Sequence, residues 1–204
     1  NTKSGTFWER GRIGFGGTIT FNGVGVGNSV HSPNVYAMAA GDFASLARAV
    51  AIGNSISTWT PIDLKEQRQI PAIGQVLTVD STYQGNFQDV IWEGVTNTWV
   101  AVGAAGSIFT AVGLTTAEAF SQYSGTLQQL NAVTFGQSEF IAVGNGGVIL
   151  ASNDGTGWSP KVSNTVFDLN DVLYDGSRFI VVGDNGTIGT VSYTHLRAHE
   201  TAFY

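Results

Sequence analysis

Two histidines near the C-terminus, His195 and His199, lie four residues apart. On a helix this spacing puts both imidazoles on one face, where they could hold a metal ion. The third histidine, His31, follows a glycine-rich stretch, as is typical of a solvated loop residue, and the chain has no cysteine. Metal or triad chemistry based on histidine therefore depends on the C-terminal pair.

The segment that contains this pair, Val191 to Thr201, is similar to the translation of a transposase-type sequencing adapter. Such strings occur at the ends of reading frames from metagenomic assemblies, and all eleven residues match. We therefore expect residues 191–204 to be a non-native tail and exclude them from the reasoning about the fold. Without them no histidine pair remains, and we predict no metal site, no catalytic residue and no cofactor.

Three polar residues occupy similar places in the chain, each close to a valine. Asp89 precedes Val90, Asp171 precedes Val172, and Asn131 lies two residues before Val133. If these segments are the inner strands of repeated sheets, the three side chains could face a central channel and bind a polar ligand. Duplication of a strand-start turn would give the same repetition without any ligand, and we favour it. The ligand itself stays unknown.

The most specific local motif is Ser152-Asn-Asp-Gly-Thr-Gly-Trp158. It resembles the Asp-box, or bacterial neuraminidase repeat, with one residue fewer between Asp154 and Trp158. An aspartate in a tight turn accepts hydrogen bonds from the backbone N–H groups that follow it, and a tryptophan can pack between sheets. We therefore predict a structural role for Ser152, Asp154, Gly155 and Trp158. The alternative is a carbohydrate or calcium site, although Asp154 and Asn153 supply few of the oxygens that calcium needs.

A repeated segment indicates which elements position these residues. The copies begin at Trp99, Phe140 and Phe179, so they are 41 and 39 positions apart, and each ends in Val-Gly-x-x-Gly. A period near 40 with four short strands per unit is typical of a β-propeller blade. Each such sheet must stack on its neighbours to bury both faces.

The sequence thus predicts an all-β chain, a partial β-propeller of four-stranded antiparallel blades. We expect these units: a glycine-rich β remnant (1–34), a degenerate blade with an insertion within 64–83 (35–83), a blade (84–123), a blade with the Asp-box (124–163), a truncated blade (164–190) and the tail (191–204). In the clearest unit, Gly144–Gly147 is expected to form a tight hairpin.

Together the two motifs resemble the Asp-box propeller superfamily, which includes sialidases, photosystem II assembly factors and many phage and bacterial surface proteins. The resemblance covers residues 84–190 well and residues 35–62 weakly. It implies a non-catalytic binding or structural module, with a protein or a glycan held by the loops of the ring face. The alternative is a fragment of a sialidase-like glycoside hydrolase. Against it, the sialidase Arg-Ile-Pro segment is matched only by Arg68-Gln-Ile-Pro71, which has an extra residue.

Composition narrows the choice of partners. The net charge is −6 and only 12% of the residues are charged, so there is no basic surface for nucleic acid. No apolar run approaches the ~20 residues of a membrane span. We expect self-association through blade faces left open, and the resemblance favours an extracytoplasmic or virion context.

Overall fold

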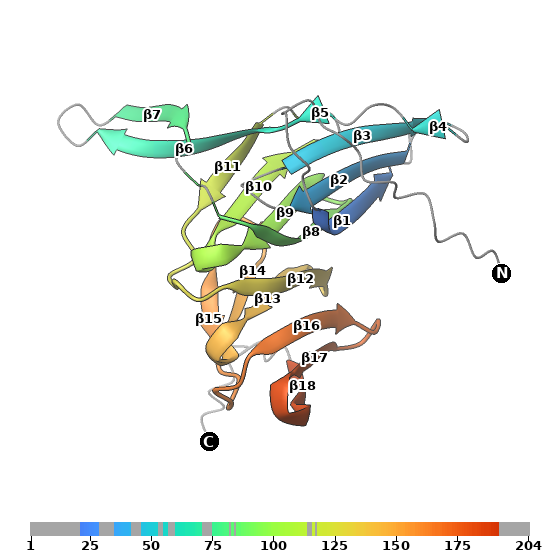
Figure 1. Ribbon diagram of the computed structural model, residues 1–204, viewed down its shortest axis with the longest axis vertical. Coiled ribbons are helices and arrows are strands. Elements are labelled where there is room, and N and C mark those ends of the chain that lie inside the picture. The colour runs from blue at the N-terminus through green and yellow to red at the C-terminus, as the bar shows by residue number, and fades with distance from the viewer. Residues whose placement is uncertain are drawn as a thin grey trace, which may run out of the picture.

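The computed structural model describes residues 21–28, 35–41, 46–52, 55–56, 60–70, 75–81, 83, 85–113, 116 and 118–191. These residues form β-strands and three short 3-10 turns. Four sheets follow one another in chain order and stack down the molecule, from β1 at one end to β18 at the other (Figure 1). The predicted all-β class is confirmed.

The first and second sheets are larger than a four-stranded unit. The first sheet contains β1 (Phe21–Asn28), β2 (Val35–Gly41), β3 (Leu46–Ile52), β4 (Ser55–Ile56) and β5 (Thr60–Pro61). The second sheet contains β8 (Phe87–Glu93), β9 (Thr98–Gly103), β10 (Ile108–Val112) and β11 (Glu118–Gln122), extended at the β11 edge by β6 (Asp63–Ile70) and β7 (Gln75–Asp80).

The third and fourth sheets carry the clearest repeats. The third contains β12 (Leu130–Gly136), β13 (Glu139–Gly144), β14 (Ile149–Ser152) and β15 (Ser159–Lys161), all antiparallel. The fourth contains β16 (Leu169–Tyr174), β17 (Phe179–Gly183) and β18 (Ile188–Val191).

Strand β13 explains why the sheets must stack. All six of its residues are buried, although successive side chains of a strand point to opposite faces. Ile141 and Val143 pack in one cluster with residues of the fourth sheet. Phe140 and Ala142 pack in another cluster with residues of the second sheet. The nearly continuous apolar run in the sequence therefore reflects a strand that is covered on both faces.

The segment Gly144–Gly147 forms the expected tight hairpin between the antiparallel strands β13 and β14, and Gly146 and Gly147 take the positive φ that such a turn requires. It contains a single 3-10 turn, Asn145–Gly147, and the same turn occurs at Ala104–Gly106 and Asp184–Gly186. Gly147 has a φ of +74°, and a Cβ atom there would lie 2.1 Å from the Thr165 carbonyl oxygen. The last glycine of each Val-Gly-x-x-Gly segment thus adopts a left-handed conformation. At Gly147 the absence of a side chain also lets the backbone of Thr165 approach closely.

A hairpin of strands β6 and β7 occupies most of the segment 64–83, in which the sequence predicts an insertion. Strands β6 and β7 form an antiparallel pair, and β6 also pairs in parallel with β11, with Glu118 opposite Asp63. The hairpin projects to one side of the stack (Figure 1). The predicted unit boundaries stay predictions, although the one at 34/35 falls between β1 and β2 of a single sheet. Residues 1–20 and 192–204, with His195 and His199, lie outside the described residues, as does His31.

Candidate functional site

Asp89 connects the second sheet to the third. Its Oδ1 accepts a hydrogen bond from the backbone N–H of Val90 at 2.8 Å, and its Oδ2 accepts one from the N–H of Val133 at 3.0 Å. Burial raises the pKa of this carboxyl to about 6, although the two N–H donors oppose the rise. Asp89 is therefore used as an inter-sheet contact.

Asn131 has the same kind of role one sheet further on. Its Nδ2 donates to Asn145 Oδ1 and to the Leu169 carbonyl oxygen of the fourth sheet, both at 2.8 Å. Asn22 of β1 likewise donates to the Phe87 carbonyl oxygen of the second sheet at 2.7 Å. Both asparagines occupy the extra residue of a β-bulge in the first strand of their sheet.

Asp171 differs from the other two candidates because it is exposed. The strand register makes Asp171 the counterpart of Asp89, and its Oδ1 accepts from the N–H of Val172 at 2.8 Å. The register makes Asn131 the counterpart of Asn170 instead, since both occupy the bulge. No hydrogen bond of the described residues joins the three candidates to one another. The negative charge of Asp171 nevertheless adds to the rise that burial causes in the pKa of Asp89, so the two carboxylates interact. A shared polar site of the three residues stays a prediction.

The Asp-box-like turn is held by its own side chains. Asp154 Oδ1 accepts from the N–H groups of Thr156 at 2.8 Å and Gly157 at 3.1 Å, and from Ser152 Oγ at 3.1 Å. Burial of the carboxylate opposes ionisation, but these donors prevail and lower its pKa to about 2.

The same turn also contacts the neighbouring sheet. The Gly155 carbonyl oxygen accepts from Trp158 Nε1 at 3.0 Å and from Thr110 Oγ1 of the second sheet at 2.6 Å. Gly155 itself is buried against Val100. This geometry is that of a structural turn that joins two sheets.

Two loops of nearly identical construction connect the last strand of one sheet to the first strand of the next. In residues 123–129, Thr126 N–H donates to Ser124 Oγ, and Gln128 N–H donates to Thr126 Oγ1 at 3.1 Å. In residues 162–168, Thr165 and Phe167 make the same bonds to Ser163 and Thr165. We call these two loops, together with the adjacent 3-10 turns 104–106 and 145–147, the loop face.

The loop face presents apolar side chains to solvent. Each loop exposes one apolar side chain at its first position and a second one four residues later. These are Tyr123 and Leu127 in the first loop and Val162 and Val166 in the second. The second loop also exposes the ring of Phe167. A local hydrogen-bond network fixes the backbone beneath them, so little conformational entropy would be lost when a partner binds. Sequence reasoning missed these loops, although the shared Ser-x-Thr spacing could have identified them.

A hollow lies beside the first of these loops. Its volume is about 380 Å³, and its lining includes Tyr83, Ser107 and the segment 123–127. Tyr83 packs against Phe87 and Phe109 with ring centroids 5.1 and 5.5 Å apart, and its hydroxyl donates to the Asn86 carbonyl oxygen at 2.9 Å. Burial raises the pKa of the Tyr83 phenol. The hollow therefore combines aromatic surface with a few hydroxyl groups and the carboxylate of Glu66.

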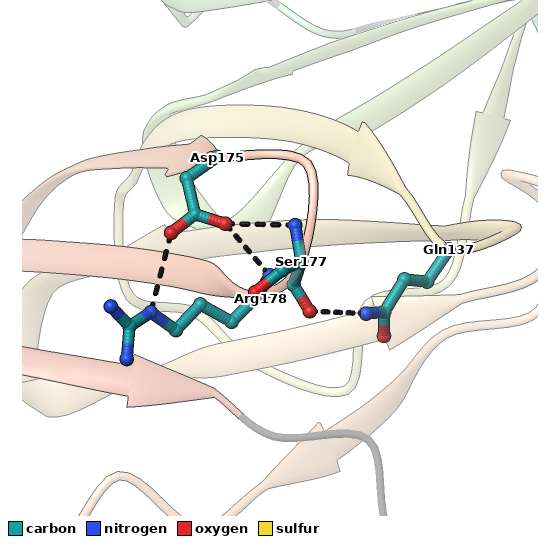
Figure 2. Close-up of polar contacts among 4 residues, drawn as sticks. All are labelled: Gln137, Asp175, Ser177 and Arg178. Carbon is teal, nitrogen blue, oxygen red and sulfur yellow. Dashed lines mark hydrogen bonds and ion pairs between the residues drawn. The ribbon is translucent and has the colours of Figure 1, made fainter.

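The opposite strand ends are closed by polar turns. Figure 2 shows Asp175, whose Oδ1 accepts from the N–H groups of Ser177 and Arg178 at 2.8 and 2.9 Å and whose Oδ2 pairs with Arg178 Nε at 3.2 Å. Gln137, from the corresponding turn of the third sheet, donates to the Ser177 carbonyl oxygen (Figure 2). These turns join neighbouring sheets through hydrogen bonds and leave the loop face as the more apolar end.

Two kinds of feature are absent from the described residues. No group of three or more histidine, aspartate or glutamate side chains there could hold a metal ion. No helix in the described ranges is long and apolar enough to cross a membrane.

Comparisons with known proteins support the fold. No family model matches the sequence, and no curated protein matches it. Among solved structures, the computationally designed protein Ika4 is similar at a TM-score of 0.57 and 10% identity, over 91% of this chain and 98% of that one. YCF48 from Cyanidioschyzon merolae is similar at 0.54 and 18%, over 85% of this chain and 50% of that one.

A second YCF48 structure, solved bound to D1 peptide, is similar at a TM-score of 0.52 and 16% identity, over 86% of this chain and 50% of that chain. The chain thus spans about half the length of these YCF48 chains. YCF48 is a β-propeller, and at these identities the likeness bears on the fold alone. The predicted partial β-propeller of antiparallel blades is confirmed.

Proposed function

We propose that this chain is a non-catalytic module that binds an extended segment of another protein on its loop face. The observation that carries the proposal is the repetition of a rigid loop that exposes aliphatic and aromatic side chains at matching positions, one sheet apart. An extended peptide could lay alternate side chains on successive loops and place one in the hollow beside Tyr83.

A peptide suits this surface better than a glycan does. Sugars stack on exposed aromatic rings, and Tyr123 could serve in that way, but Leu127, Val162 and Val166 are aliphatic. Exposed aliphatic groups gain free energy when apolar side chains cover them. The YCF48 structure solved with a peptide is consistent with a peptide partner for a similar fold.

The absence of catalysis is part of the proposal. Among the described carboxylates, Asp89 and Asp154 accept hydrogen bonds from backbone N–H groups that hold inter-sheet contacts and turns. Neither lies in the hollow beside Tyr83, and the one carboxylate in the lining of that hollow, Glu66, accepts a hydrogen bond from Ser81 Oγ at 2.9 Å. We expect no release of the fluorophore from a fluorogenic sialoside above the rate in buffer. Release above that rate would instead favour a glycoside hydrolase.

The sequence resemblance supports two further proposals: that the chain belongs to the Asp-box superfamily, and that it is part of a protein on the surface of a phage particle or a bacterium. Self-association through open sheet faces belongs with them. Sedimentation of the full chain over a range of concentrations would reveal it as a rise in mass.

The central experiment is selection of peptides from a displayed library by the purified full chain. We expect the selected peptides to be extended and rich in apolar residues. Fluorescence polarisation of one labelled peptide should then show at least ~10-fold weaker binding to Leu127→Lys, a loss of about 1.4 kcal/mol. Val95→Lys is the matched control, because Val95 is equally open to solvent but lies in the β8–β9 turn at the opposite strand ends.

Two outcomes would contradict the proposal. Equal weakening by both lysine variants would indicate a charge effect without a site on the loop face. Selection of a glycan from an array, with no peptide enriched, would indicate a carbohydrate-binding module.

A further inference from the structure

The fourth sheet has an apolar face that its counterparts in the second and third sheets keep buried. A valine that precedes the 3-10 turn pairs across strands with an isoleucine that follows it, in all three sheets. In the second and third sheets this pair is 0–5% exposed, whereas in the fourth sheet the valine is 38% exposed and the isoleucine 77%. The pairs are Val102–Ile108, Val143–Ile149 and Val182–Ile188.

What covers these pairs is the same in both buried cases. Val143 and Ile149 pack in one cluster with Leu169 and Val172, which belong to the first strand of the next sheet. Val102 and Ile108 pack with the corresponding leucine and valine of the third sheet, Leu130 and Val133. The covering element is therefore a first strand of the form Leu-x-x-Val.

Polar groups accompany the apolar contact. An asparagine at the bulge donates to the backbone carbonyl of the next first strand, as Asn22 and Asn131 do. In the second sheet, the carboxylate of Asp89 accepts from the N–H of the next sheet's valine, Val133. These bonds fix the position of each sheet on its neighbour.

The fourth sheet carries both polar groups. Asn170 Nδ2 donates to Asp184 Oδ1 at 2.7 Å, as Asn131 does to its own turn. Within the described part of the chain, no inter-sheet hydrogen bond is made by the second Nδ2 hydrogen of Asn170 or by Asp171 Oδ2. Both residues are exposed.

We propose that the outer face of β16–β18 is a docking surface for a further four-stranded sheet of the same repeat. Its first strand would place a leucine and a valine on Val182 and Ile188. The carbonyl of that leucine would accept from Asn170, and the N–H of that valine would donate to Asp171. The proposal extends an apolar interface that the chain already forms twice, between the second and third sheets and between the third and fourth, and it is independent of the peptide site.

The test uses thiol labelling, because the chain has no cysteine of its own. Ile188→Cys is prepared in the full chain and in a second protein that carries an extra, unsubstituted copy of residues 153–191 after Val191. This segment follows the third strand of the third sheet, so it supplies a fourth strand, the connecting loop and the next first strand. We expect rapid labelling in the first protein. In the second, we expect labelling slower by on the order of 100-fold, because reaction then requires opening of the new interface.

Two controls make the labelling result specific. Val95→Cys lies far from this face in the β8–β9 turn and should react equally fast in both proteins. In the extended protein, Asp171→Ala should restore faster labelling of Ile188→Cys, whereas Asp175→Ala should not. Circular dichroism checks that all variants fold.

Each remaining outcome would overturn the proposal. Rapid labelling in the extended protein would mean that the face does not accept a sheet of this repeat. Slow labelling in the unextended chain that becomes faster on dilution would identify a second copy as the occupant. Slow labelling at every concentration would mean that the chain covers the face by itself.

Discussion

At the residue scale, a glycine can be required for its positive φ or for the close approach of another backbone segment, and two adjacent glycines of one turn distinguish these two requirements. Gly146 and Gly147 both have positive φ, but a Cβ atom on Gly146 would meet nothing closer than 3.8 Å, whereas one on Gly147 would lie 2.1 Å from the Thr165 carbonyl oxygen. Ala105 tolerates the position of Gly146 in the second sheet, with a φ of +54°. Close approach is therefore the stricter requirement.

Alanine substitution at these two glycines should show the difference. Gly146→Ala should lower the free energy of unfolding by about 1 kcal/mol, the cost of a left-handed alanine. Gly147→Ala should lower it by about 2 to 4 kcal/mol, because the loop at Thr165 must also move. Urea unfolding of both variants measures the effect. Equal losses would mean that the 162–168 loop does not pack on this turn.

Asp89 gives a prediction about pH. Its pKa is raised to about 6 in the folded chain, from an ordinary value of 3.8. The folded state therefore binds this proton more tightly than the unfolded state does, and the resulting stabilisation is present at low pH and lost as the pH rises from about 4 to about 6. Asp89→Asn removes this titration and keeps one acceptor oxygen.

The quantity to compare is the free energy of unfolding of the unmodified chain minus that of Asp89→Asn. This difference should decrease by about 1 to 2 kcal/mol when the pH rises from about 4 to about 6.5. Urea titrations at four pH values provide the measurement, and the subtraction cancels the groups that both proteins share. A difference that stays constant, or that increases with pH, would show that Asp89 is not buried between the sheets.

At the element scale, the Asp-box-like turn acts as a contact between sheets. Thr110 in β10 reaches across to the Gly155 carbonyl oxygen. Thr110→Val keeps the size of the side chain but removes this donor, so we expect a loss of about 1 kcal/mol. Thr134→Val in β12 is the control, since no hydrogen bond of the Thr134 side chain is found among the described residues. Equal effects in thermal unfolding would rule out the contact.

The strands that the sequence predicted best are those whose burial is encoded locally. The run Phe140–Val143 is apolar at every position because sheets cover both of its faces, and the glycines after it indicate a turn that needs positive φ. These two signals together set the period of about 40 residues and hence the fold class.

Features that depend on partners distant in sequence could not be predicted. Strand β6 carries Lys65 and Glu66 and pairs in parallel with β11, some 50 residues later, and no local pattern marks such a pairing. The sequence groups Asn131 with Asp89 and Asp171 because each of them lies close to a valine, but the bulge that aligns Asn131 with Asn170 is visible only in the strand register. The loop face was missed because exposed apolar residues look like core residues in a sequence.

At the scale of the whole molecule, stability comes from sheets that each bury one face of the sheet before them (Figure 1). Such a stack resembles a one-dimensional repeat, in which each unit is stabilised by its neighbours. Among the described residues, the sheet at the β18 end has the fewest strands, and it has exposed apolar side chains. We therefore expect protection from solvent to decrease from the third sheet to the fourth.

The most direct measurement is the rate of thiol labelling at three equivalent positions, Val102→Cys, Val143→Cys and Val182→Cys. The valines are 0%, 0% and 38% exposed, respectively. We predict that the first two react at least ~100-fold more slowly than the third, because a neighbouring sheet must first separate from them. Equal rates at all three positions would contradict the stacked arrangement on which the proposed binding surface depends.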